Sequence, residues 1–351
     1  MTEPTLTLRC PADLLTVIPY VVGYHPTDSL VVLGLDGRRV VFGARFDAPF
    51  ADGRAVGEIH DIVRRQRCDA AFLVGYGPPD LIDDPLTRLH LALEGGPLAI
   101  REVLRAHDGR YWSYLCRDPD CCPPGGIPYD PQANQVAAAA TLAGAVIHRD
   151  REAYAAQLDP VNADPRAMAL ATDRAYQELC GVLAKADDEQ AAADAMLVAG
   201  EAALIAAADR VRDGHPLTDD EVAWLSVLLL HDDLRDLGWL HIVRAGDDLL
   251  AHRALWMDVM RRCERDLLAA PATLFGFAAW RFGQGALARV AFERALDADP
   301  GCGLARRLMY GLDQGMPPDE FDRLADDPVT PRRGPRRSRR SSSRRVGSPP
   351  A

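Results

Sequence analysis

Lysine is almost absent from this sequence. Of 351 residues only Lys185 is a lysine, against 39 Arg. Schiff-base chemistry and lysine-based phosphate binding both need a lysine amine in a site, so one residue leaves almost no room for either. There is also no Gly-x-x-x-x-Gly-Lys-Ser/Thr loop, no Gly-x-Gly-x-x-Gly after a predicted strand and no His-Glu-x-x-His. These absences argue against a P-loop nucleotide-binding protein, a dinucleotide-binding protein and a zinc peptidase.

Long apolar runs and a leader are also missing. The longest apolar stretches, 136–147 and 196–208, stop short of the roughly 20 residues that cross a membrane. Residues 1–8 lack the basic region and apolar core of an export signal. We therefore expect a cytoplasmic protein without membrane contact. The eight Cys are scattered apart from one cluster, which predicts reduced thiols rather than a disulfide framework.

Charge is distributed unevenly along the chain. The formal net charge is -11, yet residues 331–351 contain eight Arg and no acid, so residues 1–330 carry -19. An acidic body repels phosphate backbones, whereas the basic tail is suited to contact nucleic acid, another acidic surface or the body itself. Residues 328–351 are mostly Pro, Arg, Ser and Gly, and we expect disorder there because such a segment cannot bury a core.

Residues 1–129 mix strand and helix signals. The predicted elements are a helix from Pro11 that ends at Pro19 and Gly23, strands over 30–35, 39–46, 70–76, 100–107 and 110–116, and helices over 52–67 and 85–93. The dipeptides Asp36-Gly37 and Asp108-Gly109 favour tight hairpins. This pattern predicts an α/β or α+β domain with a mixed sheet.

Residues 130–327 carry helical signals only. Asp164-Pro165 places an N-cap before a first-turn proline, and Thr218 with Glu221 forms a capping box. Helices are predicted over 131–148, 165–185, 188–212, 219–231, 233–243, 247–264, 272–282, 286–297 and 302–314. The second domain is therefore expected to be all-α.

One window of the helical region, 269–302, resembles a tetratricopeptide repeat. Gly276 takes the position where two helices cross closely, and Gly283 takes the turn between them. The packing positions of the second helix are filled by Ala288, Phe292 and Ala295. The first helix departs from the pattern, because Ala272 and Ala279 replace large residues there. Ordinary helix packing with a chance match is the alternative.

Two segments of the first domain offer candidate catalytic or ligand-binding side chains. The loop before the first strand supplies His25, Asp28 and Ser29, and the second hairpin supplies Arg110 and Trp112. Asp28 and Ser29 also suit a loop-structuring role, because such side chains bond their own backbone in turns. Trp112 equally suits a cross-strand pair that stabilises the sheet. Neither segment has the Gly-x-Ser-x-Gly context of a nucleophile elbow.

Three cysteines lie within seven residues, at Cys116, Cys121 and Cys122. A structural zinc site normally has four ligands in pairs two to four residues apart, so a fourth ligand such as His107 or His25 is needed from elsewhere. Adjacent Cys121 and Cys122 also have difficulty in pointing at one ion. No cofactor is predicted, and zinc binding, redox pairing and an ordinary turn all remain open.

Several motifs together resemble a known family. They are Leu8-Arg9-Cys10-Pro11-Ala12-Asp13-Leu14-Leu15, Pro19-Tyr20, Gly23-Tyr24-His25-Pro26, Asp28-Ser29-Leu30-Val31-Val32, Asp108 to Cys116, Cys121-Cys122-Pro123, Pro128-Tyr129, Ala279-Trp280 and Asp299-Pro300. The chain is similar over 6–315 to the actinobacterial domain-of-unknown-function family 4192. The resemblance implies a cytoplasmic bacterial protein and brings no activity, cofactor or catalytic residue with it.

Three functions are compatible with these signals. The first is an interaction or regulatory protein that binds a protein partner through the helical half. The second is a hydrolase or transferase for a small ligand, which requires His25, Asp28, Trp112 and Cys116 to converge. The third is nucleic-acid contact through 331–351, which requires salt-dependent binding.

Overall fold

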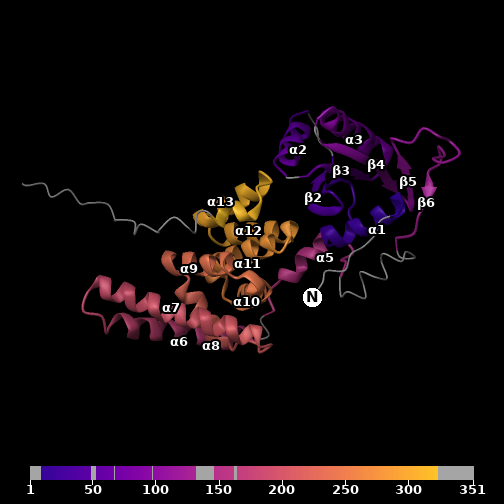
Figure 1. Cartoon of the computed structure of the whole chain (residues 1–351). Coiled ribbons are helices and arrows are strands. Elements are labelled where there is room, and N and C mark those ends of the chain that lie inside the picture. The colour runs from indigo at the N-terminus through magenta and orange to yellow at the C-terminus, as the bar shows by residue number, and fades with distance from the viewer. Residues whose placement is uncertain are drawn as a thin grey trace, which may run out of the picture.

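The computed structural model describes residues 9–48, 53–66, 68–96, 98–131, 146–161 and 164–322 (Figure 1). It divides into an N-terminal half built on a sheet and a C-terminal half built from helices, as the sequence predicts.

A six-stranded mixed sheet forms the N-terminal half. Its strands are β1 Ser29–Asp36, β2 Arg39–Asp47, β3 Ala70–Tyr76, β4 Ala99–His107, β5 Arg110–Ser113 and β6 Ile127–Pro128. They lie in the order β2-β1-β3-β4-β5-β6, with β3 and β4 parallel and the other neighbours antiparallel. Gly37 and Gly109 turn the two hairpins at φ 59° and 68°, a left-handed conformation that favours glycine.

Helices cover both faces of this sheet. α2 (Gly53–Arg65) and α3 (Pro79–Leu93) pack on one face, and α1 (Pro11–Val22) packs on the other. Successive residues of a strand point to opposite faces, so Val32 of β1 joins the core under α2 and α3 while Val31 joins the core under α1. The central strands β1 and β3 are therefore buried on both sides.

The C-terminal half is a stack of helices. They are α5 Arg151–Ala155, α6 Pro165–Leu183, α7 Glu189–Arg212, α8 Asp219–Leu228, α9 Asp232–Val243, α10 Leu249–Arg262, α11 Ala269–Arg281, α12 Gly285–Ala298 and α13 Gly303–Asp313. Short 3₁₀ turns lie at 156–158, 246–248, 265–267 and 318–322. The hairpin of α6 and α7 projects farthest from the sheet (Figure 1).

α11 forms the centre of the helical stack. Every residue from 271 to 280 is buried, and α9, α10, α12 and α13 all contact this helix. A Cβ on Gly276 would lie 2.5 Å from the Phe292 ring, so only glycine permits this approach of α11 to α12. Apolar packing on all sides thus fixes the pair that the sequence likens to a repeat.

The two halves share one apolar core. A single cluster of buried side chains runs from Leu14 of α1 through Tyr154 of α5 to Phe275 of α11. A polar contact also joins the halves, because Arg65 Nη1 of α2 donates to the carbonyl oxygen of Gln314 at 2.7 Å. The chain therefore folds into two connected layers rather than two separate bodies.

Two predicted helix boundaries were wrong, and both involve proline. Pro19 lies inside α1, which continues to Val22 and ends where Gly23 adopts φ 94°. α3 begins at Pro79 rather than Pro85, and Pro85 lies inside it as a buried residue. A proline removes one backbone donor but does not always end a helix when burial of the helix face outweighs the lost hydrogen bond.

Smaller differences concern short elements and the residues at the margins. β5 ends at Ser113 rather than at Cys116, and neither the two-residue β6 nor the five-residue α5 was predicted. Most of the predicted helix 131–148 and the whole tail 328–351 lie outside the described residues. The predictions for these two segments stay untested.

Candidate functional site

Backbone hydrogen bonds to neighbouring segments hold the loop of His25, Asp28 and Ser29. The His25 amide donates to the carbonyl oxygen of His148 at 3.1 Å, and the Asp28 carbonyl accepts from the Ala48 amide at 2.9 Å. Asp28 adopts φ 44°, a conformation in which aspartate is enriched. Ser29 begins β1 with its side chain fully buried, and its Oγ finds no partner among the described residues. The three residues therefore shape the entry to β1.

The register separates this loop from the second hairpin. Ser29 pairs with Tyr76, and Tyr76 pairs with Ala106, which in turn pairs with Tyr111 of β5. Three strand steps of about 4.8 Å place the backbones roughly 14 Å apart. Both segments lie at the same end of the sheet, but side chains of His25 and Asp28 do not meet those of Arg110 and Trp112 directly.

Arg110 and Trp112 fix the loop that follows β5. Arg110 Nη1 donates to the carbonyl oxygens of Gly125 at 3.1 Å and Gly126 at 3.0 Å. Trp112 Nε1 donates to the carbonyl oxygen of Pro124 at 2.9 Å. Both candidates therefore clamp the end of the loop that carries the cysteines.

A buried arginine on the same sheet was not predicted as a site residue. Arg105 of β4 is 7% exposed, and its guanidinium lies 3.9 Å from the centroid of the Trp112 ring. Arg105 Nε is 3.0 Å from Asp83 Oδ1 of α3, and the Tyr114 hydroxyl also bonds Asp83. The signal in the sequence is an arginine inside an apolar strand, where a charge requires a partner.

The three cysteines converge as a thiol cluster (Cys116, Cys121 and Cys122). Their Sγ atoms all lie within 4.8 Å of one another, and those of Cys121 and Cys122 are 4.0 Å apart. A hydrogen bond with the backbone of Asp118 lowers the pKa of Cys116, whereas the thiol of Cys116 and partial burial raise the pKa of Cys122 to about 12. Two neighbouring thiols of the cluster therefore have pKa values shifted in opposite directions.

A second candidate site lies in the helical half, where α6, α7 and α8 meet. A hollow of about 310 Å³ opens between them, a size at the lower end of ordinary ligand pockets. We call it the docking hollow, and it is lined by Glu178, Val182, Ala199, Ala203, Ala206, Ala207, Glu221, Trp224 and Leu225. Its walls are apolar apart from two glutamates. This chemistry suits an apolar side chain that has a positive charge nearby.

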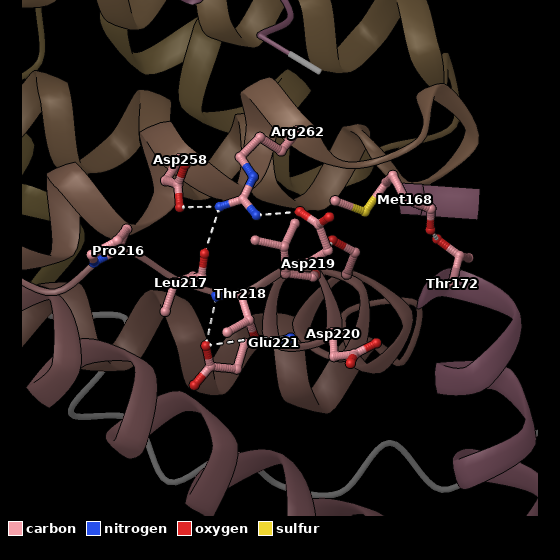
Figure 2. Close-up of polar contacts among 12 residues, drawn as sticks. Met168, Thr172, Pro216, Leu217, Thr218, Asp219, Asp220, Glu221, Asp258 and Arg262 are labelled. Atoms are coloured by element: carbon pink, nitrogen blue, oxygen red, sulfur yellow. Dashed lines mark hydrogen bonds and ion pairs between the residues drawn. The ribbon is translucent and has the colours of Figure 1, made fainter. Parts of the chain in front are cut away.

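The first turn of α8 anchors the walls of the docking hollow. Thr218 and Glu221 form the predicted capping box, with the Glu221 amide donating to Thr218 Oγ1 at 3.2 Å (Figure 2). Burial alone would raise the pKa of Glu221, but hydrogen bonds from Thr218 and the charges of Arg210 and Arg262 outweigh it and leave the pKa lowered. Glu221 is therefore a fixed negative charge in the hollow at neutral pH.

Each acidic residue of this turn also pairs with an arginine of a different helix. Asp220 accepts from Arg174 Nε of α6 at 2.9 Å, and Glu221 lies 3.5 Å from Arg210 Nε of α7. The third arginine comes from α10 (Figure 2). Its Arg262 guanidinium bonds Asp219 at 2.5 Å, and Asp258 and the Leu217 carbonyl oxygen at 2.9 Å each. α8 thus connects three helices through one turn.

α7 presents an apolar face that the other described residues leave open. By length and composition this helix is apolar enough to cross a membrane, because an 18-residue window of it has a mean hydropathy of 1.6. Only 22% of that window is buried. Val198 and Ile205 are 70% and 44% exposed, and Ala202 between them is exposed too. These three residues form the α7 stripe, since spacings of four and three place them on one side of a helix.

The α7 stripe borders the docking hollow. Ala199, Ala203 and Ala206 line the hollow, and each follows a stripe residue by one position. Successive residues are about 100° apart around a helix, so the two surfaces are neighbours on α7. Together they form one apolar surface.

The fold and these sites define a two-part protein with a thiol cluster on the loop that follows β5 and an open apolar surface on the helices. The chain belongs to the family of the domain of unknown function DUF4192, whose model matches residues 11–319. The match confirms the family expected from the motifs of the sequence. No curated protein and no solved structure matches the chain.

Proposed function

We propose that this protein binds a partner protein through its helical half, and that the partner supplies an amphipathic, basic helix. The observation that carries the proposal is the docking hollow, an apolar cavity with Glu178 and Glu221 in its wall, continuous with the exposed α7 stripe. A contiguous apolar surface of this kind marks an interaction site in a folded protein.

The charge of the hollow selects the chemistry of the partner. Glu178 is exposed at the rim, and Glu221 is held in place by its capping box. Arg210 and Thr218 already compensate the charge of Glu221. An apolar side chain that enters the hollow removes water from the Glu178 carboxylate as well, so a lysine or arginine beside it on the partner compensates that charge. An acidic helix would meet repulsion instead.

The helix-in-groove mode fits the shape of the surface. A partner helix that follows α7 places anchors at three- and four-residue spacing against the α7 stripe, and one anchor enters the docking hollow beside Trp224. In this proposal the tetratricopeptide-like pair α11–α12 acts as scaffold, because α11 is buried on all sides. The alternative of a small-ligand enzyme has less support, since three strand steps separate its proposed residues.

A synthetic amphipathic peptide of Leu, Ala and Arg tests the proposal, with a Glu-for-Arg peptide as its counterpart. We expect the Arg peptide to bind the full-length chain in calorimetry, more weakly at high salt, and the Glu peptide not to bind. Ala203→Phe fills the hollow and Glu178→Arg reverses its charge, and each should weaken binding by about tenfold or more.

Two matched variants serve as controls. Ala254→Phe adds the same ring at an exposed alanine of α10, and Glu94→Arg reverses an exposed charge beside α3, so neither should change binding. Equal binding of both peptides, or equal losses in the control variants, would refute the proposal. Binding to neutral lipid vesicles that Ala203→Phe abolishes, without peptide binding, would instead assign the surface to a membrane.

A further inference from the structure

The thiol cluster is a site that partner binding does not use. Its three Sγ atoms lie within 4.8 Å of one another. A tetrahedral ion with metal–sulfur bonds of about 2.3 Å holds its sulfur ligands about 3.8 Å apart. The Cys121 and Cys122 sulfurs are already at 4.0 Å, so small side-chain movements close the cluster around one ion.

A turn overcomes the difficulty that adjacent cysteines normally present. In an extended chain the side chains of Cys121 and Cys122 would point to opposite sides. Here the Cys122 amide donates to the Asp118 carbonyl oxygen at 2.7 Å, and the Asp120 amide donates to Asp118 Oδ1 at 2.9 Å. This bend places both sulfurs on the side of Cys116.

Hydrogen bonds hold the loop of the thiol cluster at both ends. Trp112 and Arg110 hold its far end through the carbonyl oxygens of Pro124, Gly125 and Gly126. At its near end, the Cys116 amide donates to Ser113 Oγ at 3.2 Å. A metal ion that binds here therefore loses little affinity to ordering of the chain.

The placement of the thiols also argues against two other roles, that of buried apolar side chains and that of a disulfide. Free cysteines that serve as small apolar residues are among the most buried side chains, but Cys121 is exposed and its two neighbours are half-buried. A disulfide joins two sulfurs at about 2.05 Å, so the third cysteine of the cluster would stay unpaired. Three converging surface thiols match the ligand number of a metal site.

We propose that Cys116, Cys121 and Cys122 bind one thiophilic divalent cation of the zinc class through three thiolates, with the fourth position open to solvent. Three protein ligands and one open position are the arrangement of zinc sites that take water or a substrate atom. Binding releases the thiol protons, so it weakens as pH falls.

Cobalt(II) titration of the reduced full-length chain tests this site, followed by competition with zinc and elemental analysis. We expect one equivalent of metal, thiolate-to-cobalt charge-transfer bands and the visible bands of a tetrahedral ion, all displaced by zinc. Cys116→Ser or Cys121→Ser should reduce affinity by more than the roughly 10- to 100-fold that an outer-shell partner contributes.

Two other cysteines complete the design. Cys180→Ser removes an exposed thiol of α6 and should leave metal binding unchanged. Cys10→Ser removes an exposed thiol at the N-cap of α1 and should also leave metal binding unchanged. A loss with Cys10→Ser equal to that with Cys116→Ser would overturn the open fourth position. Binding no tighter in the parent chain than in Cys116→Ser would overturn the site itself.

Discussion

α11 and α7 are both apolar helices rich in small residues, but the molecule uses them in opposite ways. α11 is buried from 271 to 280, whereas only 22% of the most apolar window of α7 is buried. Both contain a glycine that admits a neighbour, Phe292 against Gly276 and Leu234 against Gly200. α11 has neighbours on all sides, whereas α6, α8, α9 and α10 pack against α7 but leave the face of Val198, Ala202 and Ile205 open among the described residues. Burial is therefore decided by how the neighbouring helices are arranged around a helix, not by its composition alone.

The largest expected effect comes from the packing of α11. Phe292→Ala should lower the free energy of unfolding by about 3–5 kcal/mol, because a fully buried ring is lost and a cavity remains. Urea denaturation followed by circular dichroism measures this cost. A cost below about 1 kcal/mol would show that the α11–α12 contact is loose.

The α8 anchor should show an intermediate effect. Arg262→Leu leaves Asp219, Asp258 and a carbonyl oxygen without their arginine, and its side chain is only 16% exposed, so we expect a loss of about 1–3 kcal/mol. Arg174→Leu breaks a pair with 56% and 66% exposed side chains and should cost less than about 1 kcal/mol. Equal losses for Arg262→Leu and Arg174→Leu in urea denaturation would contradict the expectation that the more buried arginine contributes more.

Acidification should weaken the helical half. Burial lowers the pKa of His252, and the charge of His241 lowers it further, while Asp248 opposes both. Burial likewise lowers the pKa of His241, with Glu201 opposing and Arg244 adding to it. Both folded-state values lie below 6.5, so the unfolded chain binds more protons as pH falls through that range. The two histidines therefore make their full contribution to the free energy of unfolding above about pH 6.5, and this contribution decreases as pH falls below it.

Urea midpoints at pH about 7.5 and about 5.5 measure this effect. His252→Gln should reduce the difference between the two midpoints, because one of the two depressed groups is removed. A difference that is unchanged in His252→Gln would assign the pH dependence to other groups, such as the carboxylates.

The smallest effect is expected on the α7 stripe. Ile205→Ser replaces a side chain that is 44% exposed and should change the free energy of unfolding by less than about 1 kcal/mol in dilute solution. Analytical ultracentrifugation of the same sample establishes whether the chain is a monomer. A large cost in a self-associated sample would mean that a second copy already covers the stripe.

The order of the elements was predictable because its signals are local. Asp36-Gly37 and Asp108-Gly109 marked both hairpins, and Thr218 with Glu221 marked the start of α8. Pro19 and Pro85 were wrongly predicted to bound helices, because the effect of a proline on a helix depends on burial, and a short stretch of sequence does not show burial. Local chemistry thus locates elements better than it locates their ends.

The candidate sites were predictable only in part. The three cysteines stood out by number, but their convergence depends on the turn at Asp118, which overrides the expectation that neighbours point apart. Arg110 and Trp112 stood out as well, yet their bonds go to carbonyl oxygens of a loop whose path the sequence does not give. The docking hollow exists only where three helices meet, so no local pattern announces it.

The contact between Arg65 and Gln314 has a consequence for synthesis of the chain. Its two residues are 249 positions apart, so it forms only after nearly all of the described chain has left the ribosome. Until then, water rather than the Gln314 carbonyl oxygen solvates this arginine of α2. Because contacts between distant residues form slowly, closing this junction is a late step of folding. A chain truncated before α13 should therefore keep its sheet but expose the end of α2 to proteases.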